Sequence, residues 1–275
     1  MIIVSAASGA LGGLVIDRLL TRLPAAEVVA AVRDPSGAPQ LAARGVTLRR
    51  GDYDDADSLR TAFAGADRLL LISSPELDPE RRTRHHLTAV DAARAAGVGS
   101  VVYTSFLGSD APRPGVPDAH HATEQALHDS GLPRTVLRHP FYSEAYLDAP
   151  LLRAAVAAGE LIDGTGGRGL NTALRADLAE AAAVVLTEEG HLGRAYDFTG
   201  EPWTLPELAL TLSRVSGTPV ARVERDEPAP GPRGWLDGLV RSGALERRTG
   251  DLRAVLGRPA TGLEEAVTRA LGAAS

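Results

Sequence analysis

The chain has 275 residues, which is enough for one large domain or for a domain with a smaller second lobe. A formal net charge of −6 argues against a nucleic-acid binder, which needs a basic surface. The absence of cysteine excludes disulfides, thiolate metal sites and a cysteine nucleophile, and because all 29 basic residues are arginine, a catalytic lysine is excluded as well.

The first residues do not have the pattern of a secretory signal peptide. Asp17 and Arg18 interrupt the apolar stretch, and no basic segment precedes it. No window approaches the roughly 18 apolar residues that a membrane-spanning helix requires. We therefore expect a cytoplasmic protein that binds neither a membrane nor nucleic acid.

Short β-rich segments alternate with helical patterns in the first half of the chain. Continuous apolar strands separated by helices predict a parallel sheet covered on both faces. The right-handed crossover rule then favours an α/β fold with a doubly wound, Rossmann-like sheet. The predicted strands are residues 2–5, 28–32, 46–49, 69–73, 101–104 and 135–138, and the predicted helices are residues 10–22, 37–44, 56–64, 79–96 and 119–130.

The pattern changes after about residue 140. Strand candidates become sparse (residues 195–198 and 220–223), helices dominate, and the chain contains a glycine-rich loop at 163–171 and a proline-rich connector at 226–234. We predict a nucleotide-type Rossmann domain over 1–140 and a smaller, mainly helical lobe over 141–275, some segments of which return to the Rossmann sheet. Because ligands of open parallel sheets bind beyond the carboxyl ends of the strands, the lobe is expected to cap that edge.

The opening segment MIIVSAASGALGG has the pattern of a strand that turns tightly into a helix. Measured against G-x-x-G-x-x-G it has Ala6, Gly9 and Gly12 at the three marked positions. The second and third glycines allow close approach to a pyrophosphate and close helix–strand packing, and alanine can serve at the first position if φ stays negative. The helix N-terminus offers free amides to an anion, and Ser8 adds a hydroxyl. A dinucleotide cradle is favoured over a first turn without a ligand, which the pattern alone leaves open.

Polar residues that follow the next three strands support a dinucleotide. Arg33 lies just past the second strand, where a guanidinium suits a 2′-phosphate and favours NADPH, with NADH as the second candidate. The alternative is a solvated loop arginine. Asp52 and Tyr53 follow the third strand, where they are expected beside adenine unless they only form a helix N-cap cluster. Ser73 and Ser74 end the fourth strand, beside the expected nicotinamide ribose.

Several segments also carry a family resemblance. VSAASGALG, AAVRDP, GDYDD, LLLISSPE, VVYTSFLG, DAHHATEQAL, LRHPFYSEAYL and YDFTGEPWTL occur in the order and spacing of the NmrA-like atypical short-chain dehydrogenase/reductases. Among these the chain most resembles the NADPH:quinone oxidoreductases. The resemblance implies a Rossmann domain that binds NADP(H), a small C-terminal substrate-binding lobe, and hydride transfer to quinones.

The resemblance also implies roles for individual residues. It places a serine near the nicotinamide and two aromatic residues of LRHPFY beside the nicotinamide and substrate. The predicted cofactor-binding residues are Ala6, Ser8, Gly9, Ala10, Leu11, Gly12, Arg33, Asp52, Tyr53, Ser73, Ser74 and Ser105, and the predicted substrate-binding residues are His139, Phe141, Tyr142 and Tyr146. The chain departs from the family at Ala6, where glycine is usual. It departs from the quinone reductases at two further positions: they have asparagine where His139 stands and lysine where Gln125 stands.

The Tyr-x-x-x-Lys pair of ordinary short-chain dehydrogenases cannot operate in a chain without lysine. His120 and Glu124 lie one helical turn apart on the same predicted face. A carboxylate raises the pKa of an imidazole, so His120 could deliver a proton near neutrality; the alternative is a polar surface pair. The predicted catalytic residues are His120, Glu124, Ser105 and Tyr142. No metal site is predicted, because adjacent histidines on a helix point in different directions.

Three functions are compatible with these residues. The favoured one is an NADPH-dependent reductase that transfers hydride to a quinone or a related aromatic carbonyl compound. The alternatives are a tailoring enzyme of aromatic polyketide biosynthesis, acting as a reductase or a monooxygenase, and a non-catalytic dinucleotide-binding redox sensor. The expected partner is a small aromatic or quinone substrate, and the expected assembly is a monomer or a homodimer.

Overall fold

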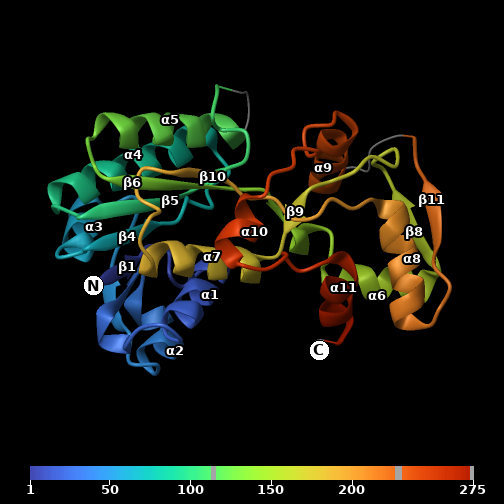
Figure 1. Ribbon diagram of the computed structural model, residues 1–275, viewed down its shortest axis with the longest axis horizontal. Helices are drawn as coiled ribbons and strands as arrows, with labels where there is room; N and C mark the ends of the chain where they lie inside the picture. The colour runs from blue at the N-terminus through green and yellow to red at the C-terminus, as the bar shows by residue number, and fades with distance from the viewer. Residues whose placement is uncertain (113–115, 227–230, 273–275) are drawn as a thin grey trace. The chain divides into compact units, whose positions relative to one another are not determined.

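The computed structural model describes residues 1–112, 116–226 and 231–272, and the chain divides into two compact units. The first unit comprises Met1–His139 and Leu178–Phe198, and the second comprises Pro140–Asp177 and Thr199–Ser275. Figure 1 shows the elements of both units. In the described part of the chain, no helix combines the length and the apolar character that crossing a bilayer requires.

A seven-stranded parallel sheet forms the centre of the first unit. Its order reverses beside β1, which pairs with β2 on one side and with β4 on the other. In spatial order the strands are β10 (Ala195–Asp197), β6 (Arg134–His139), β5 (Ser100–Phe106), β4 (Arg68–Leu71), β1 (Ile2–Val4), β2 (Val28–Val32) and β3 (Thr47–Arg50). This confirms the predicted doubly wound, Rossmann-like sheet. In such sheets ligands bind at the carboxyl edge, where the order reverses.

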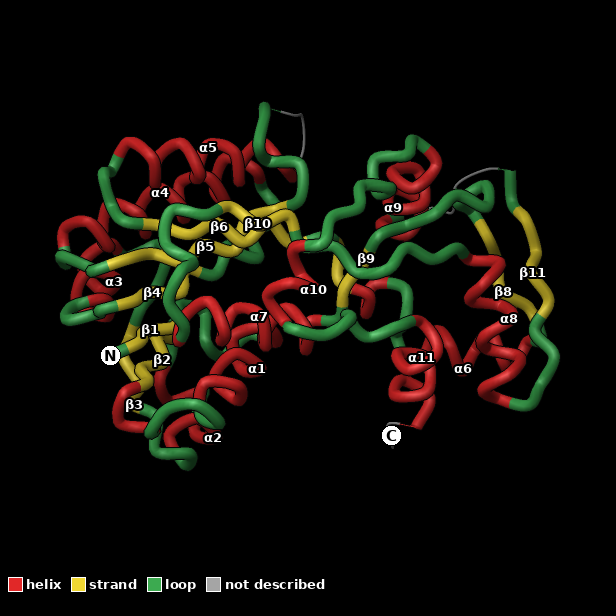
Figure 2. The backbone as a smooth tube through the Cα atoms, viewed as in Figure 1, coloured by secondary structure: helices red, strands yellow, loops and turns green. Residues whose placement is uncertain are grey.

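Helices cover both faces of this sheet (Figures 1 and 2). The strands are apolar on both sides because both faces are covered; all five residues of β2, for example, are buried. One face carries α1 (Ala10–Leu19), α2 (Pro39–Ala42) and α7 (Arg175–Thr187), and the other carries α3 (Ala56–Phe63), α4 (Pro79–Ala95) and α5 (Val116–Asp129). The predicted helix at 37–44 is instead a 3₁₀ turn, Pro35–Gly37, followed by α2, because Pro39 starts a new helix.

Helix starts at the carboxyl edge follow local capping rules. The carboxylate of Asp55 accepts from the Ser58 amide at the start of α3, and that of Asp78 accepts from the Arg81 amide at the start of α4. Pro79 then occupies the first position of α4, where a missing amide hydrogen is harmless. These caps fix where the loops after β3 and β4 end and the helices begin.

The described residues of the second unit form short strands and five helices around an apolar core of their own. β7 (Phe141–Tyr142) pairs with β9 (Thr172–Ala173), and β8 (Glu160–Asp163) pairs with β11 (Ala221–Glu224), both in parallel. The helices are α6 (Ala149–Ala158), α8 (Leu205–Ser216), α9 (Pro232–Arg241), α10 (Asp251–Leu256) and α11 (Leu263–Gly272), and a 3₁₀ turn spans Ser143–Ala145. α9 begins inside the predicted proline-rich connector at 226–234, whose residues 227–230 lie outside the described residues.

Candidate active site

The turn after β1 brings the backbone of α1 close to the end of the strand. A Cβ atom at Gly12 would lie 2.6 Å from the carbonyl oxygen of Ala6 and 2.7 Å from the Cα atom of Ala7, so no side chain fits there. Gly9 is the N-cap of α1, and no side chain caps the helix. The first amides of α1 therefore have no side-chain acceptor, which is the arrangement that binds a phosphate.

Ala6 adopts a different backbone conformation from the one expected. Its φ is +46°, in the left-handed region, and it is the one residue other than glycine with positive φ in the described part of the chain. The expectation that φ stays negative is wrong. The turn is closed by hydrogen bonds from the Gly9 amide to the Ala6 carbonyl and from the Ala7 amide to the Ala31 carbonyl.

Replacing Ala6 by Gly is expected to stabilise the fold. The left-handed region costs alanine roughly 1–2 kcal/mol, and glycine loses up to about 1 kcal/mol more backbone entropy on folding, so the free energy of unfolding should rise by about 0.5–1 kcal/mol. Urea unfolding measures this change. Ala7→Gly is the matched control at a fully buried neighbour and should lower stability instead; a loss of stability in Ala6→Gly would contradict the strain.

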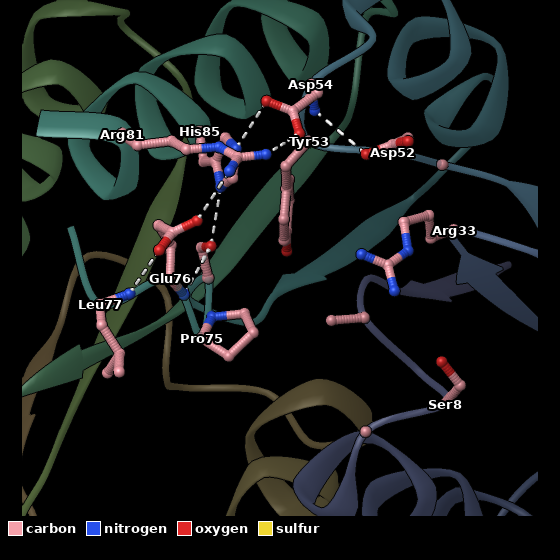
Figure 3. A pocket seen from close by; sticks show the side chains of 14 residues that line it. Ser8, Arg33, Asp52, Tyr53, Asp54, Pro75, Glu76, Leu77, Arg81 and His85 are labelled. Atoms are coloured by element: carbon pink, nitrogen blue, oxygen red, sulfur yellow. Dashed lines mark hydrogen bonds and ion pairs between the residues drawn. The ribbon is translucent and has the colours of Figure 1, made fainter.

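A cavity of about 460 Å³ opens at the carboxyl ends of β1, β2, β3 and β4. Figure 3 shows Arg33 and Ser8 on one side of it and Arg81, His85 and Glu76 on the other. Its lining residues are Ala6, Ser8, Gly9, Arg33, Gly51, Asp52, Tyr53, Asp54, Ser74, Pro75, Glu76, Leu77, Arg81 and His85. The cavity thus brings together seven of the twelve predicted cofactor-binding residues, while Ala10, Leu11, Gly12, Ser73 and Ser105 do not line it.

Arg33 is exposed at this cavity, and its guanidinium makes no hydrogen bond or ion pair with any described residue. It points into the cavity from the end of β2 (Figure 3). A planar cation that is not ion-paired with a carboxylate, beside uncapped helix amides, is suited to a phosphate oxyanion.

The opposite wall of the cavity is an ion-pair cluster that the sequence analysis missed. Arg81 on α4 lies 2.7 Å from Asp54 and 3.3 Å from Glu76, and the Nε2 atom of His85 lies 2.9 Å from Asp54. Hydrogen bonds from Arg81 and His85 lower the pKa of Asp54 to about 2, so its carboxylate is ionised. The signal available in the sequence was the run of charges PELDPERR directly after the fourth strand.

Two predicted residues that line the cavity are held by part-buried or buried hydrogen bonds. The hydroxyl of Tyr53 bonds the Ser5 hydroxyl at 2.8 Å and the Ile72 carbonyl, and burial raises its pKa. The Ser74 hydroxyl lies 2.9 Å from the Nδ1 atom of His85. Both contacts tie the end of β4 to neighbouring elements.

The predicted pairing of His120 with Glu124 is wrong. Glu124 instead accepts two hydrogen bonds from Arg138, at 2.9 and 2.6 Å, and one from the Ser105 hydroxyl at 2.5 Å. Arg138 also lies 3.3 Å from Asp197. A bidentate arginine competes successfully with a histidine for a carboxylate, because its fork matches both oxygens.

His120 is therefore not the acid that the sequence suggested. Its side chain is buried and its Nδ1 atom lies 2.8 Å from the Tyr103 hydroxyl. Burial, assisted by the nearby His86, Arg82 and His139, holds the pKa of His120 well below its ordinary value, so the imidazole is neutral at pH 7.

The other predicted acceptor-side residues lie in two environments. His139, at the end of β6, is buried and stacks on Phe198 with ring centroids 5.8 Å apart, and burial lowers its pKa to about 3. In the second unit, the Arg175 guanidinium lies 4.3 Å above the ring of Tyr142, and Tyr146 is packed in the apolar core with Arg233 over its ring. Phe141 packs edge-on against Trp235. Their roles toward substrate stay predictions.

Comparisons with known proteins agree with this geometry. The NAD(P)H-binding family matches residues 6–189. The chain is 40% identical to "Quinone oxidoreductase 2" of Escherichia coli (strain K12), over 98% of each chain, and 30% identical to an "NmrA-like family domain-containing oxidoreductase" of Aspergillus flavus, over 92% of this chain and 80% of that one. The crystal structure of the Citrobacter sp. triphenylmethane reductase complexed with NADP(H) superposes with a TM-score of 0.93 at 36% identity, covering 98% of this chain and 100% of that one.

Proposed function

Since the chain belongs to the NAD(P)H-binding family of NmrA-like atypical short-chain dehydrogenase/reductases, we propose that it reduces a quinone or a related aromatic carbonyl compound with NADPH. The chain is an NADPH-dependent reductase, and the class of acceptor is the proposed part. The overall reaction is NADPH + H⁺ + quinone → NADP⁺ + hydroquinone, in which two electrons reach the acceptor.

The described residues fit the cofactor at its phosphate groups. Gly12 allows α1 to lie against the strand end, and the uncapped amides beyond Gly9 are available to bind an anion. We assign Arg33 to the 2′-phosphate, and Asp52 and Tyr53 to the adenosine side of the cavity. Bound NADPH supplies the hydride, which is the cofactor's own chemistry.

The observation that carries the quinone proposal is the state of the groups around the carboxyl end of β5. His120 is neutral at pH 7, burial raises the pKa of the Tyr103 phenol, and Glu124 is held by Arg138. Neither His120 nor Tyr103 is a ready proton donor near neutral pH, and the Glu124 carboxylate accepts hydrogen bonds from Arg138 and Ser105. An acceptor that becomes a stabilised aromatic oxyanion on reduction needs little acid assistance, and quinones have this property. The relative from E. coli that is named as a quinone oxidoreductase supports the same class.

A quinone panel tests the proposal. We expect the protein to oxidise NADPH, followed by absorbance, when simple benzoquinones and naphthoquinones are added. Gly12→Ala should abolish NADPH binding and turnover, because its Cβ atom would displace α1. Gly13→Ala, where an added Cβ meets nothing within 4 Å, is the matched control and should keep both.

Other results of the same assay would contradict the proposal. No turnover across the panel, with NADP⁺ still bound tightly, would favour the redox sensor. Oxygen uptake with an anthrone or a hydroquinone, in place of quinone reduction, would favour the tailoring monooxygenase.

A further inference from the structure

A chain of buried side chains connects α4, β5 and α5 near the carboxyl edge of the sheet. It consists of Thr123, His86, Tyr103 and His120, which are each at most 5% exposed. The Nδ1 atom of His86 lies 2.9 Å from the Thr123 hydroxyl and 3.3 Å from the Tyr103 hydroxyl, and the Tyr103 hydroxyl lies 2.8 Å from Nδ1 of His120. Neither the sequence analysis nor the proposed reaction assigns a role to Thr123, His86 or Tyr103.

The backbone determines which nitrogen of His86 carries the proton. The Ser74 amide donates to Nε2 of His86 at 2.9 Å, so this nitrogen is an acceptor. Burial lowers the pKa of His86 to about 3, and the neutral ring must then carry its proton on Nδ1. The Thr123 hydroxyl donates to the Ala119 carbonyl at 2.7 Å and is free to accept from His86.

The direction of the next hydrogen bond follows from this proton. The hydroxyl of Tyr103 lies near two ring nitrogens, both of them Nδ1 atoms. Because Nδ1 of His86 is a donor, the phenolic proton of Tyr103 is available to Nδ1 of His120, which lies 2.8 Å away. Donation along this hydrogen bond makes Nδ1 of His120 an acceptor and places the single proton of the neutral ring on Nε2.

We propose that Thr123, His86 and Tyr103 are positioning residues that hold His120 as the neutral Nε2–H imidazole, and that this N–H donates a hydrogen bond to the carbonyl oxygen of the acceptor. His120 packs near Phe106 at the end of β5, with ring centroids 6.0 Å apart. The carboxyl ends of the strands face ligands in a doubly wound sheet. The second half of the proposal rests on the proposed function.

A neutral donor suits this chemistry. Negative charge develops on the carbonyl oxygen as the acceptor is reduced, and a fixed N–H stabilises it without a buried cation. The oxygen then takes its proton from water, so His120 keeps its own proton and ends the reaction in its starting state.

Nitrogen-15 NMR of histidine-labelled protein tests the positioning directly. Two-bond ¹H–¹⁵N correlations distinguish the tautomers, and His86→Asn and His120→Gln assign the signals among the seven histidines. At pH 7 we expect His86 as the Nδ1–H form and His120 as the Nε2–H form. Tyr103→Phe should remove the preference of His120 for the Nε2–H tautomer. Tyr196→Phe, which deletes a buried hydroxyl 2.8 Å from Nδ1 of His191, is the matched control and should leave the His120 signals unchanged.

Steady-state kinetics tests whether His120 donates a hydrogen bond to the carbonyl oxygen of the acceptor. Loss of one donor to a developing oxyanion typically costs about 100-fold in kcat, so His120→Leu should lose about that much with quinone while the KM for NADPH is retained. His120→Gln, whose amide can still donate, should recover part of the loss.

The outcomes separate the two proposals. An Nδ1–H or doubly protonated His120 at pH 7, or a Tyr103→Phe spectrum identical to wild type, would overturn the positioning. The expected tautomers in a protein that reduces no quinone would uphold the positioning and overturn the proposed function. Equal kcat in His120→Leu and wild type would overturn the donation alone.

Discussion

Replacing Arg33 by Ala should weaken NADPH binding about a hundredfold and leave NADH binding nearly unchanged, since a charge-assisted contact to phosphate contributes about 1.5–3 kcal/mol. The guanidinium has no hydrogen-bonded or ion-paired partner among the described residues, so its removal leaves no carboxylate unpaired in the cavity. The loss of affinity for NADPH should therefore reflect only the missing contact to the 2′-phosphate. NADH has no 2′-phosphate and should bind as before. Fluorescence titration with both coenzymes measures the two dissociation constants.

Arg60→Ala is the control for this loss of charge. Arg60 lies on α3, with its side chain 57% exposed and paired with Asp57, and it does not line the cavity. It should change the affinity for neither coenzyme. An equal loss of NADPH and NADH binding in Arg33→Ala would mean that this arginine contributes to the binding of both coenzymes and does not bind the 2′-phosphate specifically.

Stability should fall steeply as the pH drops from about 6.5 to about 4, because three buried histidines are neutral in the folded protein. Burial lowers the pKa of His86 and of His139 to about 3 and that of His120 well below its ordinary value. In the unfolded chain these groups titrate near 6.5. Below that pH the unfolded state binds more protons, so stability is lost as the pH falls, by up to about 1.4 kcal/mol per pH unit for each histidine.

A single substitution isolates one of these protons. His139→Asn should reduce the slope of unfolding free energy against pH by about one proton, which is about 1.4 kcal/mol per pH unit. The exposed His128, with its side chain 68% exposed, supplies the control His128→Asn, which should leave the slope unchanged. Urea unfolding at several pH values measures the slopes. Ionised carboxylates such as Asp54, whose pKa is about 2, titrate below this window. Identical slopes in wild type and His139→Asn would contradict a buried neutral His139.

Local sequence patterns predicted some residues of the site but not others. Arg33 and Asp52 were placed correctly at the cavity because each directly follows a predictable apolar strand, and parallel strands end at one edge. The short strands β7, β8 and β9 were missed, since segments of two to four residues have no usable period. The left-handed Ala6 was missed because closure of the turn depends on a hydrogen bond to β2, which the local sequence does not show.

The pairing of Glu124 shows the same limit for the chemistry. Helical spacing correctly put His120 and Glu124 on one helix, but the partner that Glu124 binds, Arg138, comes from β6. Likewise, the hydrogen-bond chain to His120 joins side chains from α4, β5 and α5.

Local patterns of apolar residues, glycines and helix caps were thus sufficient to identify the doubly wound sheet, the dinucleotide turn and the cation beside it, because each depends on neighbours along the chain. The strain at Ala6, the partners of Glu124 and the protonation state of the buried histidines required the folded protein. These properties depend on burial and on hydrogen bonds between elements that are distant in the sequence, and no spacing within a single segment encodes them.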